Sequence, residues 1–325
     1  HMTLKSLNIP GVMGSLALAA AAAPTKPNVI VIMADDLGYG DLSCFGNPSI
    51  KTPYLDRMAA EGQKWTQFYV ASPVCTPSRA GLLTGRYPIR NGMTSAKRVV
   101  LFPDSAKGLA PSEVTIAEVL KEKDYATAAV GKWHLGHLPE FLPTNQGFDT
   151  YYGIPYSNDM WPGHPESPKA WPRLPWYGAD GPIEFIDDLD DQQMITRRLT
   201  DLSVDFVHRN ADRPFLLYVP HSMPHVPLAV GPKFRQSSMY GPYADVIKEI
   251  DWSVGEIVKA LEAEGVLDRT MVIFASDNGP WINYGDHAGT TGGLREGKGT
   301  TFEGGVRVPF VVRYPPVVPP GTTCE

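Results

Sequence analysis

Cysteine is scarce in this 325-residue chain, which carries Cys44, Cys75 and Cys324 and no others. Three cysteines do not make a disulfide framework, and their spacing matches no zinc-binding pattern. Positive charge is also in deficit, because 35 acidic side chains outnumber 29 lysines and arginines and leave a net charge of -6. That balance argues against nucleic acid as a partner, since nucleic-acid-binding proteins carry clustered basic residues.

The chain also lacks a long uninterrupted apolar run. Its candidate for a membrane anchor, Leu7 to Ala23, is short and is interrupted by Asn8, Pro10, Gly11 and Gly14. Lys5 precedes this run and alanines end it, which is typical of a secretory signal peptide. We interpret residues 1–25 as a cloning remnant, His1-Met2, followed by a signal-peptide-like segment. We therefore expect a periplasmic or secreted protein with no stable membrane anchor.

From Pro27 onward, short apolar runs alternate with amphipathic stretches. The apolar runs predict buried strands at 28–33, 125–130, 215–219, 271–275 and 309–313. Helical periodicity predicts helices at 54–62, 112–123, 187–210 and 243–264, with Ser112 as the N-cap of the second. This alternation is typical of an α/β fold with a mostly parallel central sheet and helices on both faces.

Polar clusters follow four of the predicted strands. They are Asp35-Asp36, Lys132-Trp133-His134, His221 with His225, and Asp277-Asn278. Because ligands of open α/β sheets bind beyond the carboxyl ends of the strands, the sequence predicts an active site at this edge. Two long stretches, 135–186 and 279–308, are expected to be irregular and functional. The tryptophans of the first, Trp161, Trp171 and Trp176, are candidates for a substrate wall, although a plain surface cover is the alternative.

Cys75 lies in the segment Cys75-Thr76-Pro77-Ser78-Arg79. With Ser78 as N-cap, a helix would follow, and Cys75 would sit just before its N-terminus. Backbone amides there favour anions and lower the pKa of a thiol, and Arg79 could turn back toward the same point. A buried cysteine beside a surface arginine is the alternative interpretation.

Residues 75–86 resemble the signature of the type I, formylglycine-dependent sulfatases: Cys-x-Pro-Ser-Arg followed by Leu-x-Thr-Gly-Arg. Other segments resemble the same family in the same order: 28–40, 131–136, 153–159, 276–280 and 297–309. The resemblance is to the branch of arylsulfatase A and N-acetylgalactosamine-6-sulfatase, and it implies an alkaline-phosphatase-like catalytic domain over 26–325. Relatives usually continue into a small C-terminal antiparallel subdomain, which we expect to be missing here. The proline-rich stretch 314–320 would then be a linker leading nowhere.

The resemblance implies a sulfuric ester hydrolase that acts on an aryl sulfate or a sulfated sugar. A formylglycine-generating enzyme would oxidise Cys75 to an aldehyde, whose hydrate attacks the sulfur and expels the alcohol. The second hydroxyl of the hydrate then allows sulfate to leave and the aldehyde to reform. A serine nucleophile has no second hydroxyl and could not release sulfate by this route.

The side chains of Asp35, Asp36, Asp277 and Asn278 offer oxygen ligands, which suit a hard cation such as Ca²⁺ or Mg²⁺ rather than zinc. The resemblance implies Ca²⁺, with residue 75 as a further ligand once it is oxidised.

The same resemblance implies roles for basic residues. Arg79 and His134 would contact the hydrate, with His134 as the base of the second step. Lys132 and Lys298 would hold sulfate oxygens, and His225 would protonate the leaving oxygen.

Two further residues are candidates for substrate binding. Ser157 aligns with a sulfate-site serine of the arylsulfatase A branch. His221 has two interpretations, a direct role at the substrate or a structural position.

Two rival functions remain open at this point. One is a phosphonate or phosphate monoester hydrolase of the same superfamily. The other is a non-catalytic relative that binds sulfated glycans, although Cys75, Arg79, Lys132, His134 and Lys298 argue against it.

Overall fold

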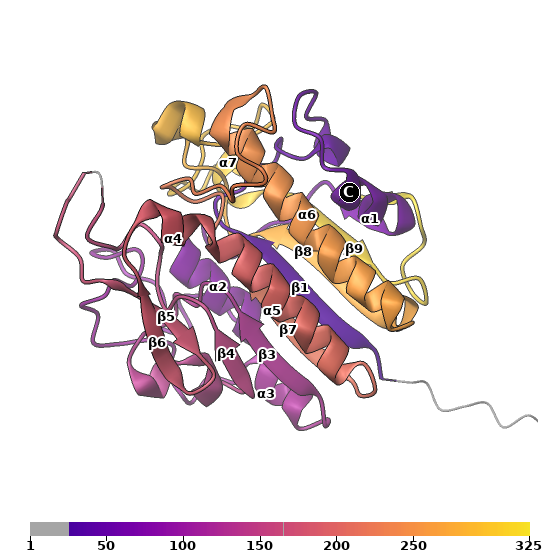
Figure 1. The fold of residues 1–325 in the computed structure, drawn as a ribbon, viewed down its shortest axis with the longest axis horizontal. Helices are drawn as coiled ribbons and strands as arrows, with labels where there is room; N and C mark the ends of the chain where they lie inside the picture. The colour runs from indigo at the N-terminus through magenta and orange to yellow at the C-terminus, as the bar shows by residue number, and fades with distance from the viewer. Residues whose placement is uncertain (1–25, 165) are drawn as a thin grey trace, which may run out of the picture.

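The computed structural model describes residues 26–164 and 166–325, so the expected signal segment at 1–25 lies outside the described residues. Its centre is an eight-stranded sheet (Figure 1). The strands are, in spatial order, β10 (Thr322–Cys324), β2 (Gln63–Trp65), β9 (Phe310–Arg313), β8 (Thr270–Ser276), β1 (Asn28–Ala34), β7 (Phe215–Pro220), β3 (Ala126–Val130) and β4 (Thr150–Tyr152). The run from β8 to β4 is parallel, whereas β9 is antiparallel to both of its neighbours. The mostly parallel sheet is confirmed.

Helices cover both faces of this sheet. They are α1 (Pro53–Glu61), α2 (Cys75–Thr84), α3 (Ile116–Lys121), α4 (Leu189–Gln193), α5 (Ile195–Asn210), α6 (Gly241–Ala263) and the short α7 (Glu303–Val306). In Figure 1, α5 and α6 cross the near face, and α2 and α3 lie behind the strands. None of the described helices is both long and apolar enough to span a bilayer.

Alternation along the strands explains why two cores form. In β1, Ile30 and Ile32 belong to one buried cluster, and Val31 and Met33 belong to the other. The first cluster takes residues from α1, α5 and α6, and the second takes residues from α2 and α3. Because successive strand side chains point to opposite faces, a nearly continuous apolar run is what a strand buried on both faces requires.

Several local expectations were wrong. The second predicted helix is shorter, and its N-cap is Thr115 rather than Ser112. Thr115 and Glu118 form a reciprocal capping box, a local pairing that stabilises the start of α3. The predicted helix 187–210 is two helices, α4 and α5, and Asp188 caps the first of them.

The long stretch 135–186 is also more ordered than expected. It contains β4, an antiparallel pair of strands β5 (Leu174–Gly178) and β6 (Gly181–Ile186), and the 3-10 turns η2 (Pro139–Phe141) and η3 (Pro143–Asn145). Other such turns are η1 (Ser43–Phe45), η4 (Leu267–Arg269) and η5 (Ile282–His287). The expectation for the stretch 314–320 was also wrong, because this stretch connects β9 to β10, which pairs with β2.

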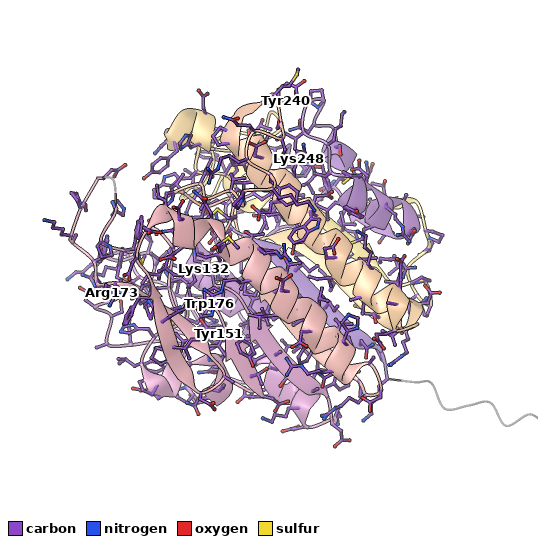
Figure 2. The ribbon with its side chains drawn as sticks, viewed as in Figure 1. Lys132, Tyr151, Arg173, Trp176, Tyr240 and Lys248 are labelled. Carbon is purple, nitrogen blue, oxygen red and sulfur yellow. The ribbon has the colours of Figure 1, made fainter. Side chains whose placement is uncertain are left out.

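Two of the tryptophans expected to contact substrate lie in the core instead. Trp161 and Trp176 are buried, and Figure 2 labels Trp176. The Arg198 guanidinium lies 4.0 Å from the Trp176 ring. Trp171 is partly buried and stacks on Phe102 with ring centroids 5.3 Å apart.

Candidate active site

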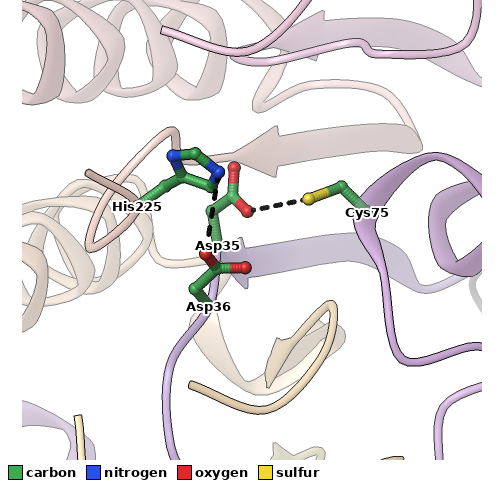
Figure 3. Close-up of side chains that lie close together, drawn as sticks. All are labelled: Asp35, Asp36, Cys75 and His225. Carbon is green, nitrogen blue, oxygen red and sulfur yellow. Dashed lines mark hydrogen bonds and ion pairs between the residues drawn. The ribbon is translucent and has the colours of Figure 1, made fainter. Parts of the chain in front are cut away.

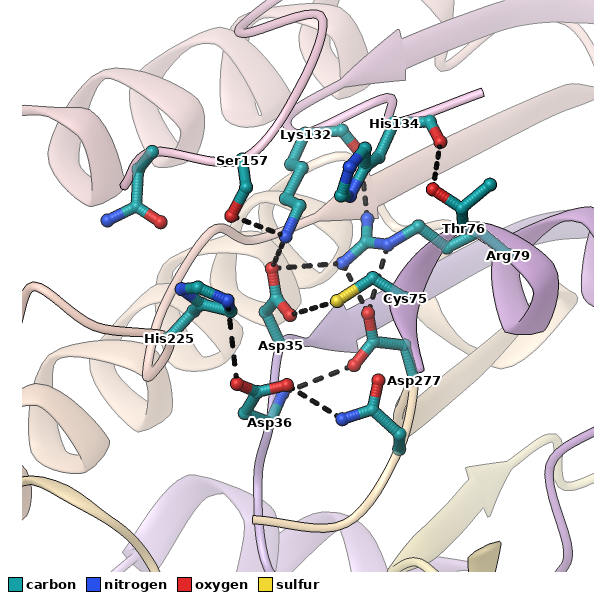
Figure 4. A network of polar contacts seen from close by, with 12 residues as sticks. Asp35, Asp36, Cys75, Thr76, Arg79, Lys132, His134, Ser157, His225 and Asp277 are labelled. Carbon is teal, nitrogen blue, oxygen red and sulfur yellow. Dashed lines mark hydrogen bonds and ion pairs between the residues drawn. The ribbon is translucent and has the colours of Figure 1, made fainter. Parts of the chain in front are cut away.

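Buried polar residues converge where the parallel strands end (Figure 4). Asp35 and Asp36 follow β1, Lys132 and His134 follow β3, His225 lies in the segment after β7, and Asp277 and Asn278 follow β8. All of these residues are nearly inaccessible to solvent. Segments far apart in the sequence thus meet at the edge that the strand order predicts.

The backbone is unusual at this edge. Asp36 and His134 have φ values of 65° and 60°, in the left-handed region that non-glycine residues rarely adopt. Gly131 lies against β7 so closely that a Cβ atom would be 2.0 Å from the carbonyl oxygen of Pro220. The Lys132 amide donates to that same oxygen at 2.7 Å. Such strained geometry is typical of sites held in place by the surrounding fold.

Cys75 is the first residue of α2, with Val74 as the N-cap, so Ser78 lies inside the helix and does not cap it. The thiol is buried and lies 3.4 Å from Oδ1 of Asp35. Burial, and then the negative charge of Asp35, raise the pKa of Cys75 well above its ordinary value. The expected lowering by the helix N-terminus was therefore wrong, and the thiol is a weak nucleophile as it stands.

Buried cations and carboxylates form a network around Cys75. Arg79 donates from Nε and Nη2 to Oδ2 of Asp277 at 3.0 and 2.8 Å, and from Nη1 to the carbonyl oxygen of Lys132 at 2.7 Å. Nζ of Lys132 pairs with Asp35, and Nζ of Lys298 lies 2.7 Å from Oδ2 of Asp36. Three cations therefore face three carboxylates in a space closed to solvent.

The electrostatics of these carboxylates are uneven. Burial alone would raise the pKa of Asp35, but Lys132 and Arg79 hold it well below its usual value. Burial, and then the charge of Asp35, raise the pKa of Asp277 to about 7. Closely spaced carboxylates repel one another, and a bound cation would relieve that repulsion.

The donor set fits a hard divalent cation. Ligand atoms of Asp35, Asp36, Cys75 and His225 all lie within 4.8 Å of one another (Figure 3). Asn278 donates from Nδ2 to Asp36, and its buried Oδ1 has no hydrogen-bond partner within the described part of the chain. Carboxylate and amide oxygens are the ligands that Ca²⁺ and Mg²⁺ prefer. The oxygens of Asp35, Asp36, Asp277 and Asn278 could hold such an ion.

Two histidines have defined tautomers. Nε2 of His134 lies 2.8 Å from the carbonyl oxygen of Leu101, and because a carbonyl only accepts, Nε2 carries the hydrogen. Its buried Nδ1 is then a free acceptor, without a partner among residues 26–164 and 166–325. By the same reasoning, Nδ1 of His225 donates to the carbonyl oxygen of Val226 at 2.6 Å, which leaves its Nε2 toward Asp36 at 3.6 Å.

Ser157 and His221 are placed differently. Ser157 lies in the network, where its Oγ accepts a hydrogen bond from Lys132 at 3.1 Å. His221 is buried, its Nε2 lies 3.3 Å from Oγ of Ser253 in α6, and it does not line the cavity at Cys75. Its environment matches the structural interpretation of this residue.

A cavity of about 290 Å³ opens onto this network. Its lining includes Cys75, His134, Ser157, His225 and Lys298 from the predicted set. Trp281 also lines it, and as one of the seven tryptophans of the chain it was already a candidate for stacking on a sugar or aryl ring. Sequence reasoning did not single out the rest of the wall: Val74, Val99, Val100, Phe102, Asp159, Met160 and Gly299. Asp159 and Gly299 lie in the segments 153–159 and 297–309 that resemble the sulfatases, whereas the others carry no signal of their own.

Comparisons with known proteins identify the family of this chain. A family model described as Sulfatase matches residues 27–323. Human arylsulfatase A is 43% identical over 328 residues, covering 95% of this chain and 63% of that protein. The N-acetylgalactosamine-6-sulfatase of Canis lupus familiaris is 39% identical over 323 residues, covering 95% and 61%. The chain thus spans less than two thirds of the length of these relatives.

Solved structures share the fold. The PsFucS1 sulfatase from Pseudoalteromonas sp. has a TM-score of 0.83 and 34% identity, over 92% of this chain and 64% of that one. A phosphonate monoester hydrolase of Agrobacterium radiobacter has a TM-score of 0.62 and 21% identity, over 92% of this chain and 70% of that one, which shows a common fold alone. The predicted fold class is confirmed by these likenesses.

Proposed function

The chain belongs to the sulfatase family, and we propose that it hydrolyses sulfate monoesters with a formylglycine nucleophile made from Cys75. The observation that carries the proposal is the position of Cys75 at the start of α2, close to the buried cations Arg79 and Lys132 and to Lys298 at the cavity wall. A sulfate ester needs positive charge around its oxygens and a strong, positioned nucleophile. The raised pKa of the Cys75 thiol argues that the unmodified side chain does not serve as that nucleophile.

The cations of the site would bind the sulfate group. Lys132 and Lys298 are close enough for their charges to act on Cys75, and each ammonium group would contact a sulfate oxygen, with Ser157 as a third contact. Because these ammonium groups are buried, their attraction to an anion is little screened by water. Arg79 would act mainly by holding Asp277 and the start of α2 in position.

We propose Asp35, Asp36, Asp277, Asn278 and residue 75 as the ligands of a divalent cation, Ca²⁺ by resemblance to the family. Such an ion, when bound, supplies positive charge that stabilises negative charge developing on nearby oxygens. The orphaned Oδ1 of Asn278 supports this assignment.

His134 and His225 would move protons. Burial, and then the charge of Lys132, lower the pKa of His134 well below its usual value, so its free Nδ1 can accept a proton from residue 75 in its hydrated form. Burial and Lys298 lower the pKa of His225, while Asp36 and Asp159 act in the opposite direction. The negative charge of a bound sulfate would favour protonation at Nε2 of His225, which could then donate to the leaving oxygen.

Maturation and export complete the proposal. Formation of the aldehyde requires a formylglycine-generating enzyme as a transient partner. The signal-peptide-like pattern of residues 1–25 supports a periplasmic or secreted location, and residues 26–325 would carry the catalytic domain.

The deciding experiment is to produce the chain together with a formylglycine-generating enzyme. The tryptic peptide Trp65–Arg79 is then analysed by mass spectrometry and with an aldehyde-reactive probe. We expect the aldehyde at position 75, and turnover of 4-nitrophenyl sulfate that Cys75→Ala abolishes and Cys324→Ser does not.

The other outcomes are equally informative. Faster turnover of 4-nitrophenyl phosphate or phosphonate would replace the proposed substrate class. An unmodified thiol, with a known sulfatase converted in parallel, would refute the nucleophile. Sulfated-glycan binding that is unaffected by Cys75→Ala, without turnover, would favour the binding protein.

A further inference from the structure

One carboxylate of the cavity wall, that of Asp159, takes no part in the network around Cys75. Asp159 lines the cavity, and within residues 26–164 and 166–325 its side chain accepts no hydrogen bond. Its Oδ1 is buried without a partner. Its Oδ2 lies 3.8 Å from Nε2 of His164, which is too long for a hydrogen bond.

A carboxylate in this position is costly to leave unbonded. The side chain of Asp159 is only 14% exposed, so water can reach little of it. The charge of Asp159 affects the pKa values of two neighbouring side chains, His225 and Tyr284. It opposes the effect of burial on the pKa of His225, and it adds to the effects of burial and of Glu166, which raise the pKa of Tyr284 to about 12. A buried anion without donors is stabilised when a ligand brings one.

The neighbouring wall offers a flat surface. Trp281 lines the cavity, its ring centroid is 5.5 Å from that of His225, and Nζ of Lys298 lies 4.4 Å from its ring. Tyr284 packs edge-on against Trp281 with centroids 4.7 Å apart. A ring that carries the sulfate could contact Trp281, because Lys298, which would hold the sulfate, lies against the same tryptophan.

Part of the remaining wall is apolar, formed by Val99, Val100, Phe102 and Met160. Of the polar lining residues, Lys298 is engaged with Asp36 and Ser157 with Lys132, whereas Asp159 has no such partner in the part of the chain that the structure describes. A polar substituent on a ring that contacts Trp281 would therefore find Asp159 as its partner rather than the apolar wall.

We propose that Asp159 is a specificity-determining residue, which accepts a hydrogen bond from a hydroxyl or N–H group on the leaving group. Its negative charge also disfavours an anionic substituent at that same position. The leaving group is thus a ring that carries a hydrogen-bond donor at the position that faces Asp159 and no second anion there. This inference rests on the proposed sulfatase activity, and it names which ester that activity prefers.

The test uses esters with one ring and one variable substituent. Phenyl sulfate is compared with its 2-, 3- and 4-hydroxyphenyl and 2-, 3- and 4-carboxyphenyl counterparts, and kcat/KM is measured for each from sulfate release. The matured protein is compared with Asp159→Ala and Asp159→Asn. The hydroxyphenols and the 3- and 4-carboxyphenols are leaving groups of basicity similar to phenol, so an effect through proton donation by His225 would alter those esters alike. The 2-carboxyphenyl ester has a more basic leaving group, so its rates are compared only between the parent protein and the variants.

We expect the protein to prefer at least one hydroxyphenyl ester over phenyl sulfate by about ten- to a hundredfold, the range of one hydrogen bond to a charged group. Asp159→Ala should remove that preference, and the carboxyphenyl ester of the same position should be poor until Asp159→Asn improves it. The matched control is Glu166→Gln. Glu166 lies on the same loop, accepts from Tyr284 at 3.1 Å, and does not line the cavity, so its variant should keep the preference.

Other results would overturn the inference. One is an equal loss for phenyl and hydroxyphenyl esters in Asp159→Ala, which would mean that Asp159 acts through His225 or the fold. Another is a protein with no preference among the seven esters. Either result counts against the inference only if the parent protein hydrolyses phenyl sulfate and this activity depends on Cys75. A parent protein that hydrolyses none of the esters would instead refute the proposed function.

Discussion

Replacement of Arg79 by Met tests whether the buried network stabilises the fold as its geometry indicates. The guanidinium is inaccessible to solvent and makes three hydrogen bonds, two to Asp277 and one to the backbone of Lys132. Met has a similar length but offers no donor, so Asp277 would keep a buried charge beside Asp35 and Asp36 without its main partner. We therefore expect a large loss of stability rather than the small one that is typical of surface ion pairs.

The magnitude follows from the burial of the pair. Breaking one partner of a buried ion pair costs about 3–5 kcal/mol, because the other charge remains desolvated. Part of that loss is recovered if Asp277 takes up a proton, which its raised pKa of about 7 makes easier at low pH. The loss should therefore be smaller at pH 5 than at pH 8.

Equilibrium unfolding in urea at the two pH values measures this loss, if unfolding is two-state. The matched control is Arg98→Met, because Arg98 pairs with Asp104 at an exposed position, where the two side chains are 53% and 59% accessible. That variant should leave the urea midpoint unchanged, since exposed pairs are worth little. A loss below about 1 kcal/mol for Arg79→Met, or one that does not depend on pH, would refute the reasoning.

Three other predictions concern separate parts of the chain. Burial raises the pKa of Glu249 from 4.5 to about 7, so the folded state holds its proton more tightly and stability should fall as pH rises through 5 to 7. Glu249→Gln should remove up to about 3 kcal/mol of this pH-dependent fall in the free energy of unfolding. Plots of unfolding free energy against pH that run parallel for the two proteins would contradict the prediction. Added Ca²⁺ should raise the melting temperature of the matured protein, and Asn278→Ala should reduce the rise; an undiminished rise would place the ion elsewhere. Thr115→Ala should lower the free energy of unfolding by about 1 kcal/mol through loss of the capping box in α3. An equal loss of stability in Ser112→Ala would indicate that Ser112 caps the helix instead.

Local pattern predicted the five longer strands of the central sheet but missed the three-residue strands β2, β4 and β10. The runs that became β1, β7 and β8 are apolar almost throughout, as strands covered on both faces must be. Element ends were less predictable. Helix α3 begins after Thr115, and α4 begins after Asp188. Nearby serine and aspartate side chains can form the same kind of hydrogen bond to the backbone, so sequence does not decide which residue caps a helix.

The sequence by itself determined the chemistry that this chain can carry. Its motif from Cys75 to Arg86 and the polar residues that end its parallel strands specify which groups meet, because parallel strands all end at one edge. Tertiary structure alone decided the electrostatics and the walls of the site. The Cys75 thiol is buried beside Asp35, and this environment raises its pKa. The local sequence alone predicts the opposite, because it places the thiol at a helix N-terminus. Trp281 and Asp159 come from loops with no periodic pattern, and only packing decided that they face the same cavity.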